Sequence, residues 1–187
     1  RCSFRSTSDH STGTPRSSPA LIAAVTDNDG VQTGTHRTWL DPSGGMKAML
    51  ASPRRAMGNI LGIAVRFGHA DDVMIAGEGI ETMLSLREIL PTMPMAAATS
   101  SAHLAAIMFP PTLQRLYVAR DRDAAGDAAF GILTDRAQAA GIELMSLMPE
   151  LGDFNDDLRE HDASVLGQQV CLLLHEHDRT RFFNDTG

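Results

Sequence analysis

Short apolar segments alternate with helix-like segments over residues 72–148, and this alternation most strongly constrains the fold. Four segments, VMIAG, PMAAAT, LQRLYVA and IELMSLM, have the length and apolar content of buried strands. The intervening GIETMLSLREIL and AGDAAFGILTDRAQAAG show helical spacing of apolar residues, and Gly141 ends the second of them. Strands that alternate with helices in this way predict an α/β domain, with a parallel sheet of about four strands flanked by helices.

The residues before this domain have a different pattern. LIAAVTD and VQTGTHRTWL are rich in residues that favour strands, and Asn28-Asp29-Gly30 between them is a strong signal for chain reversal. We therefore expect a small antiparallel β-rich unit, to which IAVRFG adds a strand. The predicted organisation is a disordered or loosely attached tail (1–19), the β-rich unit (20–70), the α/β domain (71–160), and a C-terminal helix and tail (161–187).

Composition excludes several classes of protein. No apolar run approaches the roughly 18 residues that a transmembrane helix needs, and the first residues lack the apolar core of a secretory signal. Cys2 and Cys171 form no CxxC motif, which favours a reducing compartment and argues against a zinc site. We expect a cytoplasmic protein without a membrane partner.

Charge is distributed unevenly along the chain, whose formal net charge is −7. Residues 1–70 carry eight Lys and Arg against four Asp, whereas residues 71–187 carry eight against nineteen acids. Such asymmetry is typical of two surfaces with different partners, although a solvated acidic half explains it equally well. Trp39 could stack on a base, but a place in the hairpin core is its simpler role. The candidate nucleic-acid ligands in the basic half are Arg37, Lys47, Arg54 and Arg55.

Acidic side chains gather where the predicted strands end. Gly77-Glu78-Gly79 follows the first strand, Asp121-Arg122-Asp123 follows the third, and DFNDDL, with Asp153 and Asp156, follows the fourth. In parallel sheets, ligands bind beyond the carboxyl ends of the strands. These acids are therefore expected to line one ligand-binding edge.

The spacing of these acids favours a divalent metal. Asp121 and Asp123 would repel each other unless a cation relieves the repulsion, and carboxylate oxygens are ligands that Mg²⁺ and Mn²⁺ prefer. Glu78 could act as a third ligand or as a general base. Gly79 and Gly126 leave room for a phosphate at two helix starts. Each motif taken alone also suits a solvated loop or a helix cap, and only their joint order is specific.

The joint pattern resembles the Toprim domain of DnaG-type primases, topoisomerases and related nucleases. GEG followed by IETMLSL resembles its glutamate motif, and DRDAAG matches its D-x-D-x-A-G motif. DFNDDL resembles the D-W-N-D-x-L near the end of the domain in phage and plasmid primases. PALIAAVTDNDGVQTGTHRTWLDP is similar to the β-rich segment that precedes Toprim in certain bacterial, mobile-element proteins. The resemblance spans residues 19–160.

The resemblance implies a role for each acid. Glu78 would be the general acid/base and Asp121 and Asp123 the Mg²⁺ ligands, with Mn²⁺ as a possible substitute. Two departures stand out: Arg122 occupies a position that is often small, and the second strand ends in Thr-Ser-Ser rather than Gly-Thr. The implied secondary acids are Asp153 and Asp156.

By the same resemblance, the function is primase-like nucleotidyl transfer on a single-stranded DNA template. The implied partners are single-stranded DNA and nucleoside triphosphates, with a helicase or zinc-binding module outside this chain. A metal-dependent nuclease of the same fold and a non-catalytic DNA-binding or loading module remain alternatives. A glycosyltransferase could use D-x-D but leaves Glu78 without a role. A covalent topoisomerase is disfavoured because the only tyrosine, Tyr117, lies in a predicted buried strand, and no P-loop motif indicates an ATPase.

Overall fold

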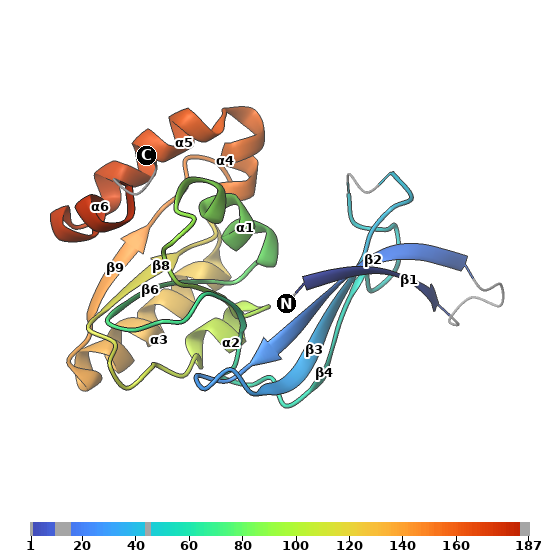
Figure 1. Cartoon of the computed structure of the whole chain (residues 1–187), viewed down its shortest axis with the longest axis horizontal. Coiled ribbons are helices and arrows are strands. Elements are labelled where there is room, and N and C mark those ends of the chain that lie inside the picture. The colour runs from blue at the N-terminus through green and yellow to red at the C-terminus, as the bar shows by residue number, and fades with distance from the viewer. Residues whose placement is uncertain (1, 10–15, 44–45, 184–187) are drawn as a thin grey trace. The chain divides into compact units, whose positions relative to one another are not determined.

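A computed structural model describes residues 2–9, 16–43 and 46–183 of the 187-residue chain. The chain divides into two compact units, Arg1–Ile60 and Leu61–Gly187. Each unit has its own sheet, and all helices of the described residues belong to the second unit (Figure 1). None of these helices combines the length and apolar composition that a bilayer crossing requires.

The first unit is a four-stranded antiparallel sheet with the strand order β1-β2-β3-β4. The turn between β2 and β3 forms as its sequence predicts. The Asp27 carboxylate accepts hydrogen bonds from the backbone N–H groups of Asp29 and Val31, and Gly30 adopts a φ of 79°. The predicted hairpin is therefore confirmed. The strands are β1 (Cys2–Asp9), β2 (Arg16–Thr26), β3 (Gln32–Trp39) and β4 (Arg54–Gly58).

Two sequence predictions for this unit are wrong. Residues 1–19 were expected to form a tail, but Cys2–Asp9 pairs along its whole length with β2, while residues 1 and 10–15 lie outside the described residues. The polar composition of this segment hides the pairing because an edge strand needs backbone partners rather than an apolar face. The unit was also expected to take its further strand from IAVRFG, whereas Arg54–Gly58 forms strand β4 and pairs with β3.

The second unit contains a five-stranded sheet with the order β5-β7-β6-β8-β9. Strands β7, β6, β8 and β9 are mutually parallel, which confirms the predicted α/β class, and β6 is central. Strand β5 pairs antiparallel with β7, so IAVRFG belongs to this sheet and not to the β-rich unit. Three residues carry too little pattern to select between two sheets. The strands are β5 (Val65–Phe67), β6 (Val73–Gly77), β7 (Met95–Ala97), β8 (Arg115–Ala119) and β9 (Glu143–Leu147).

Helices cover both faces of this sheet (Figure 1). Helices α2 and α3 pack over a buried cluster that includes Met74, Leu116 and Val118, while α1, α4 and α5 pack together on the other face. Leu84, predicted to lie on the apolar face of α1, is exposed. The helices are α1 (Ile80–Ile89), α2 (Ser101–Ala105), α3 (Ala124–Ala140), α4 (Phe154–Glu160), α5 (Ala163–Leu173) and α6 (Glu176–Phe183).

The predicted C-terminal helix and tail instead form two helices, and a buried polar network fixes the second one to strand β8. The Asp178 carboxylate is fully buried and accepts hydrogen bonds from Tyr117 Oη at 2.6 Å and Arg115 Nη1 at 2.7 Å. The His175 backbone N–H donates to Tyr117 Oη at 2.9 Å. These contacts join residues about sixty positions apart, which sequence periodicity cannot reveal. Residues 184–187, the end of the predicted tail, lie outside the described residues.

The same network determines the protonation of its members. Burial opposes ionisation of Asp178, but the hydrogen bonds from Tyr117 and Arg115 outweigh it and hold the pKa of Asp178 below its ordinary value. Burial and the adjacent carboxylate raise the pKa of Tyr117 far above its ordinary value. Tyr117 is therefore a neutral, buried hydrogen-bond donor, which agrees with its exclusion as a nucleophile.

Candidate active site

Strands β6 and β8 are direct neighbours, and their register determines the arrangement of the predicted site. Gly77 lies opposite Ala119 in the parallel ladder, so Glu78 and the D-x-D segment leave the sheet side by side at its carboxyl edge. Strand β9 is the next neighbour of β8, which brings the loop containing Asp153 to the same edge. The prediction that the acid-bearing strand ends share one edge is confirmed.

The glycines around Glu78 permit close packing. A Cβ at Gly77 would lie 2.6 Å from Met83 Cε and 3.1 Å from the Ala119 carbonyl oxygen, so a side chain there would displace strand β8 or helix α1. Gly79 is the N-cap of α1 and approaches Thr82 closely. Glu78 is half-buried between them. These contacts fix the backbone that carries the carboxylate.

Asp123 is the N-cap of helix α3. Its Oδ1 atom accepts a hydrogen bond from the Gly126 N–H at 2.7 Å, and the described residues leave its Oδ2 atom unused. A Cβ at Gly126 would lie 2.4 Å from the Asp121 carbonyl oxygen. The turn itself therefore requires Gly126, in addition to the phosphate approach predicted for it. Asp121 is half-buried, with its Oδ1 atom inside the protein.

Two arginines brace the D-x-D segment. Arg122, the departure from the Toprim pattern, donates through Nε to the Pro149 carbonyl at 2.8 Å and thereby holds the loop after β9. Arg120 forms an ion pair with Asp127 and lies over the Phe130 ring at 4.5 Å. Sequence analysis missed Arg120, although Asp127 and Phe130 lie within the following helix and could have indicated the contact.

Two of the three acids in DFNDDL, Asp153 and Asp157, accept hydrogen bonds that shape the loop. Asp153 is the N-cap of α4 and accepts hydrogen bonds from the backbone N–H groups of Asn155 and Asp156, each at 2.8 Å. Asp157 is buried and accepts from the N–H groups of Glu150 and Leu151, again at 2.8 Å. Asp156 is exposed. The metal-binding role of Asp153 and Asp156 stays a prediction.

Thr99 at the end of β7 is the one non-glycine with a positive φ, 74°, among the residues that the structure describes. Its backbone N–H donates to the Glu78 carbonyl at 2.8 Å, and its Oγ1 atom lies 3.4 Å from His103 Nδ1. A β-branched residue in this region is strained, and such strain concentrates at functional sites. Glycine adopts this conformation freely, and the resemblance to Toprim primases leads one to expect Gly-Thr at this strand end. Sequence analysis missed this feature because threonine does not signal it.

The predicted nucleic-acid ligands lie in the first unit. Arg37 and Arg55 are register partners on β3 and β4, and Arg54 is the partner of Thr38 on the opposite face. The Arg37 guanidinium lies 4.0 Å from the centre of the Trp39 ring, and Trp39 is buried, as expected for a core residue. Lys47 forms an isolated bridge with Leu40 after β3. The binding roles of these residues stay predictions.

The carboxylates suit a metal that is shared with a substrate. Over residues 2–9, 16–43 and 46–183, no three His, Cys, Asp or Glu side chains converge closely enough to hold an ion alone. Mg²⁺ usually takes one or two protein carboxylates and completes its shell with water and phosphate oxygens. Glu78, Asp121 and Asp123 provide carboxylates of this kind at the ends of adjacent strands. The donor set therefore fits Mg²⁺.

Comparison with known families supports this assignment. Residues 73–164 match the Toprim domain, and residues 1–67 match a domain of unknown function, DUF7146. Toprim domains generally bind Mg²⁺. No curated protein sequence matches significantly.

Solved primase structures share the fold. The primase fragment of the bacteriophage T7 primase-helicase is 16% identical, with a TM-score of 0.54 over 89% of this chain and 75% of that one. The Aquifex aeolicus primase, with zinc-binding and RNA polymerase domains, is 14% identical, with a TM-score of 0.58 over 92% and 48%. A DnaG primase catalytic domain bound to single-stranded DNA is 13% identical, with a TM-score of 0.54 over 81% and 50%.

Residues 73–164 of the second unit thus form a Toprim domain, and the chain shares the fold of solved primase structures. The chain spans about half the length of the Aquifex and DnaG structures that it matches.

Proposed function

We propose that the Toprim domain catalyses Mg²⁺-dependent nucleotidyl transfer on a single-stranded DNA template, as a primase does. The observation that carries this proposal is the adjacency of β6 and β8, which brings Glu78 beside Asp121 and Asp123 at the carboxyl edge of the sheet. Transfer of a nucleotidyl group needs a charge-neutralising site next to a proton acceptor. These three carboxylates meet both needs.

Each carboxylate has a distinct part in the proposed reaction. Asp121 and Asp123 would hold Mg²⁺, and the N-cap hydrogen bond from Gly126 fixes the orientation of Asp123. Bound Mg²⁺ would neutralise charge on the transferring and leaving phosphate oxygens. Glu78 would accept the proton of the attacking hydroxyl. The N-terminus of the 17-residue helix α3 adds a positive dipole at the same edge, which favours phosphate.

The proposed partners follow from the primases that share the fold. Single-stranded DNA was bound to the DnaG catalytic domain, the T7 protein is a primase-helicase, and the Aquifex structure includes a zinc-binding domain. We therefore expect single-stranded DNA and nucleoside triphosphates as substrates. A helicase or a zinc-binding module outside this chain would help select the template. We expect this reaction to take place in the cytoplasm.

A single assay tests this proposal. The chain is incubated with single-stranded DNA, labelled nucleotides, and Mg²⁺ or Mn²⁺, and the Asp121→Asn variant is the matched control. Labelled primers that depend on Asp121 support nucleotidyl transfer. Shortened DNA fragments would instead indicate a nuclease that uses the same carboxylates. If neither product forms, the enzymatic proposal is overturned and the DNA-binding or loading module remains.

A further inference from the structure

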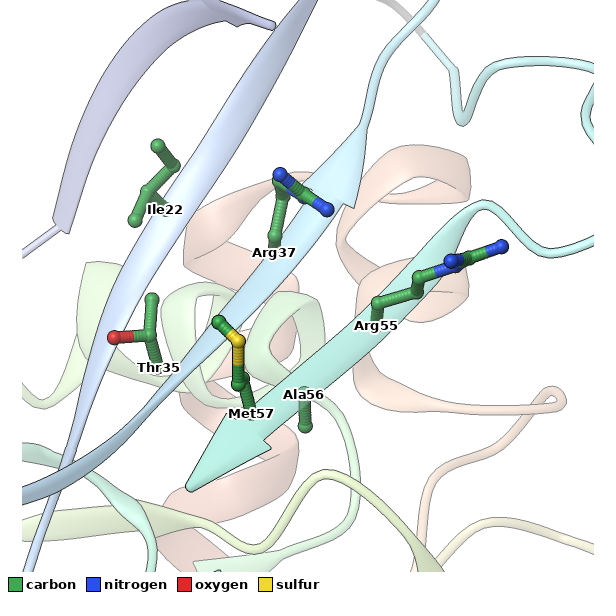
Figure 2. A pocket seen from close by; sticks show the side chains of 6 residues that line it. All are labelled: Ile22, Thr35, Arg37, Arg55, Ala56 and Met57. Atoms are coloured by element: carbon green, nitrogen blue, oxygen red, sulfur yellow. The ribbon is translucent and has the colours of Figure 1, made fainter. Parts of the chain in front are cut away.

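A pocket of about 340 Å³ opens on one face of the antiparallel sheet in the first unit (Figure 2). Its volume lies within the range of small-molecule sites. Strands β2, β3 and β4 contribute to it, and the lining residues that the structure describes include no Asp or Glu. The lining residues are Ile22, Thr35, Arg37, Arg55, Ala56 and Met57.

The register of the sheet concentrates positive charge at this pocket. Ile22, Arg37 and Arg55 are cross-strand partners in one row, and Thr35 and Met57 form the next pair on the same face. Directly opposed like charges on adjacent strands destabilise a sheet. The two guanidinium groups therefore repel each other where the pocket opens.

No carboxylate within the described part of the chain relieves this repulsion. The Arg37 guanidinium lies over the face of the Trp39 ring, and its buried Nε atom has no hydrogen-bond acceptor among the described residues. The Arg55 side chain is exposed and makes no hydrogen bond or ion pair with the described residues. Elsewhere the chain pairs arginines with acids, as for Arg115 and Arg181. The opposed pair is thus suited to an anion from outside the chain.

The other lining residues indicate which kind of anion fits the pocket. A guanidinium pair matches phosphate oxygens through parallel N–H···O bonds. Beside it, Ile22 and Met57 provide apolar surface, and Met57 is 75% exposed. Inorganic phosphate would leave this surface unused, whereas the sugar and base of a nucleotide would cover it.

We propose that the pocket binds one nucleotide, with its phosphate between Arg37 and Arg55 and its apolar rings against Ile22 and Met57. The nucleotide is either free or one unit of a single strand, and the choice of nucleotide over other amphiphilic anions rests on the proposed primase-like function. The unit that matches a domain of unknown function would thus have a defined ligand site rather than a diffuse basic surface.

Binding by the full chain without divalent metal, in the Asp121→Asn background, tests the pocket separately from the Toprim site. The probes are oligothymidylate, dTMP and inorganic phosphate, followed by calorimetry or fluorescence anisotropy. Arg55→Gln should weaken binding of oligothymidylate and dTMP about tenfold, because a charge-assisted hydrogen bond is lost. Arg87→Gln, which removes the same charge from helix α1 of the second unit, is the matched control and should change affinity by less than about twofold.

A second variant fills the pocket with its own anion. Met57→Glu should abolish nucleotide binding and raise the melting temperature of the first unit, because its carboxylate pairs with the opposed guanidinium groups. Met57→Gln, of nearly the same size, should retain binding and the wild-type melting temperature. Exposure of Met57 on an edge strand makes both variants compatible with the fold.

The outcomes separate this inference from the function on which it rests. Equal losses for Arg87→Gln and Arg55→Gln would overturn the pocket and show that binding depends only on the overall charge of the chain. Unchanged binding in Arg55→Gln and Met57→Glu would also overturn it. Equal affinity for dTMP and inorganic phosphate would show that the pocket is a general anion site and overturn its assignment to a nucleotide. Failure of primer synthesis by the wild-type chain, with pocket binding intact, would instead count against the Toprim proposal alone.

Discussion

The two units differ in how their charged side chains are paired. In the Toprim unit, the Asp123 carboxylate caps helix α3 by accepting a hydrogen bond from the Gly126 N–H, and Arg115 and Arg181 each have an acidic partner. In the antiparallel unit, Arg37 and Arg55 oppose each other without a carboxylate from the described residues. Paired charges therefore hold the Toprim fold together, whereas opposed like charges mark the places where an outside ion is expected. The predictions below test this difference.

The largest expected effect is on the buried ion pair. Asp178→Asn should lower the free energy of unfolding of the second unit by about 3–5 kcal/mol, because Arg115 keeps only its exposed partner Glu143 and Tyr117 loses its buried charged acceptor. Asp127→Asn is the matched control, since Asp127 is exposed and its ion pair with Arg120 contributes less than about 1 kcal/mol.

Urea unfolding can resolve the two units in one experiment. Far-UV circular dichroism at the helical signal reports the second unit, and fluorescence of the single tryptophan, Trp39, reports the first. Asp178→Asn should shift only the helical transition. A shift of both transitions, or of neither, would contradict the view that buried charge pairing stabilises the Toprim unit specifically.

The same pair gives the Toprim unit an acid limit. The pKa of Asp178 is lowered in the folded state, so its contribution is fully present above the ordinary aspartate value and is lost as the pH falls through the folded value. Asp72 behaves alike, because its hydrogen bond with Arg181 lowers its pKa. Below pH 3.8, the free energy of unfolding of the wild-type second unit, followed by its helical signal, should therefore fall steeply. In Asp178→Asn this pH dependence should be shallower, and an unchanged slope would assign the acid limit to other groups.

The N-cap at Asp123 separates folding from metal binding. Asp123→Ala should cost about 1 kcal/mol of stability through loss of the cap, whereas Asp123→Asn caps equally well and should be as stable as the wild type without metal. Both variants should lose the rise in melting temperature that Mg²⁺ induces. Thermal melts with and without Mg²⁺ measure both effects. A full metal-induced shift in Asp123→Asn would reduce this carboxylate to a cap.

The smallest expected effect is at Thr99. Thr99→Gly should stabilise the Toprim unit by about 1 kcal/mol, because glycine adopts a positive φ without strain. Thr99→Asn should act in the same direction, since asparagine tolerates this region. Thr99→Val keeps the β-branch and should bring no gain. Equal stability of the Gly and Val variants would show that the conformation stores no strain.

The sequence predicts features that depend on residues close together in the chain and misses those that depend on residues far apart in it. Asp121 and Asp123 are two residues apart, and their motif follows an apolar strand, so local pattern was sufficient to locate them at the sheet edge. Arg37 and Arg55 meet only through the β3–β4 register, and β4 has no apolar alternation that predicts a strand. Asp178 reaches Tyr117 across 61 positions, and no local pattern encodes that contact.

In the proposed mechanism Glu78 accepts a proton while Asp121 holds metal, and one parallel measurement separates the two roles. Metal affinity and primer formation are measured together for the wild type, Glu78→Gln and Asp121→Asn. Glu78→Gln should lose turnover by about 10²–10⁴-fold, the usual contribution of a general base, while it retains bound metal and DNA affinity. Asp121→Asn should lose both metal and turnover. Near wild-type turnover in Glu78→Gln would contradict the account and leave Glu78 as a helix-start residue.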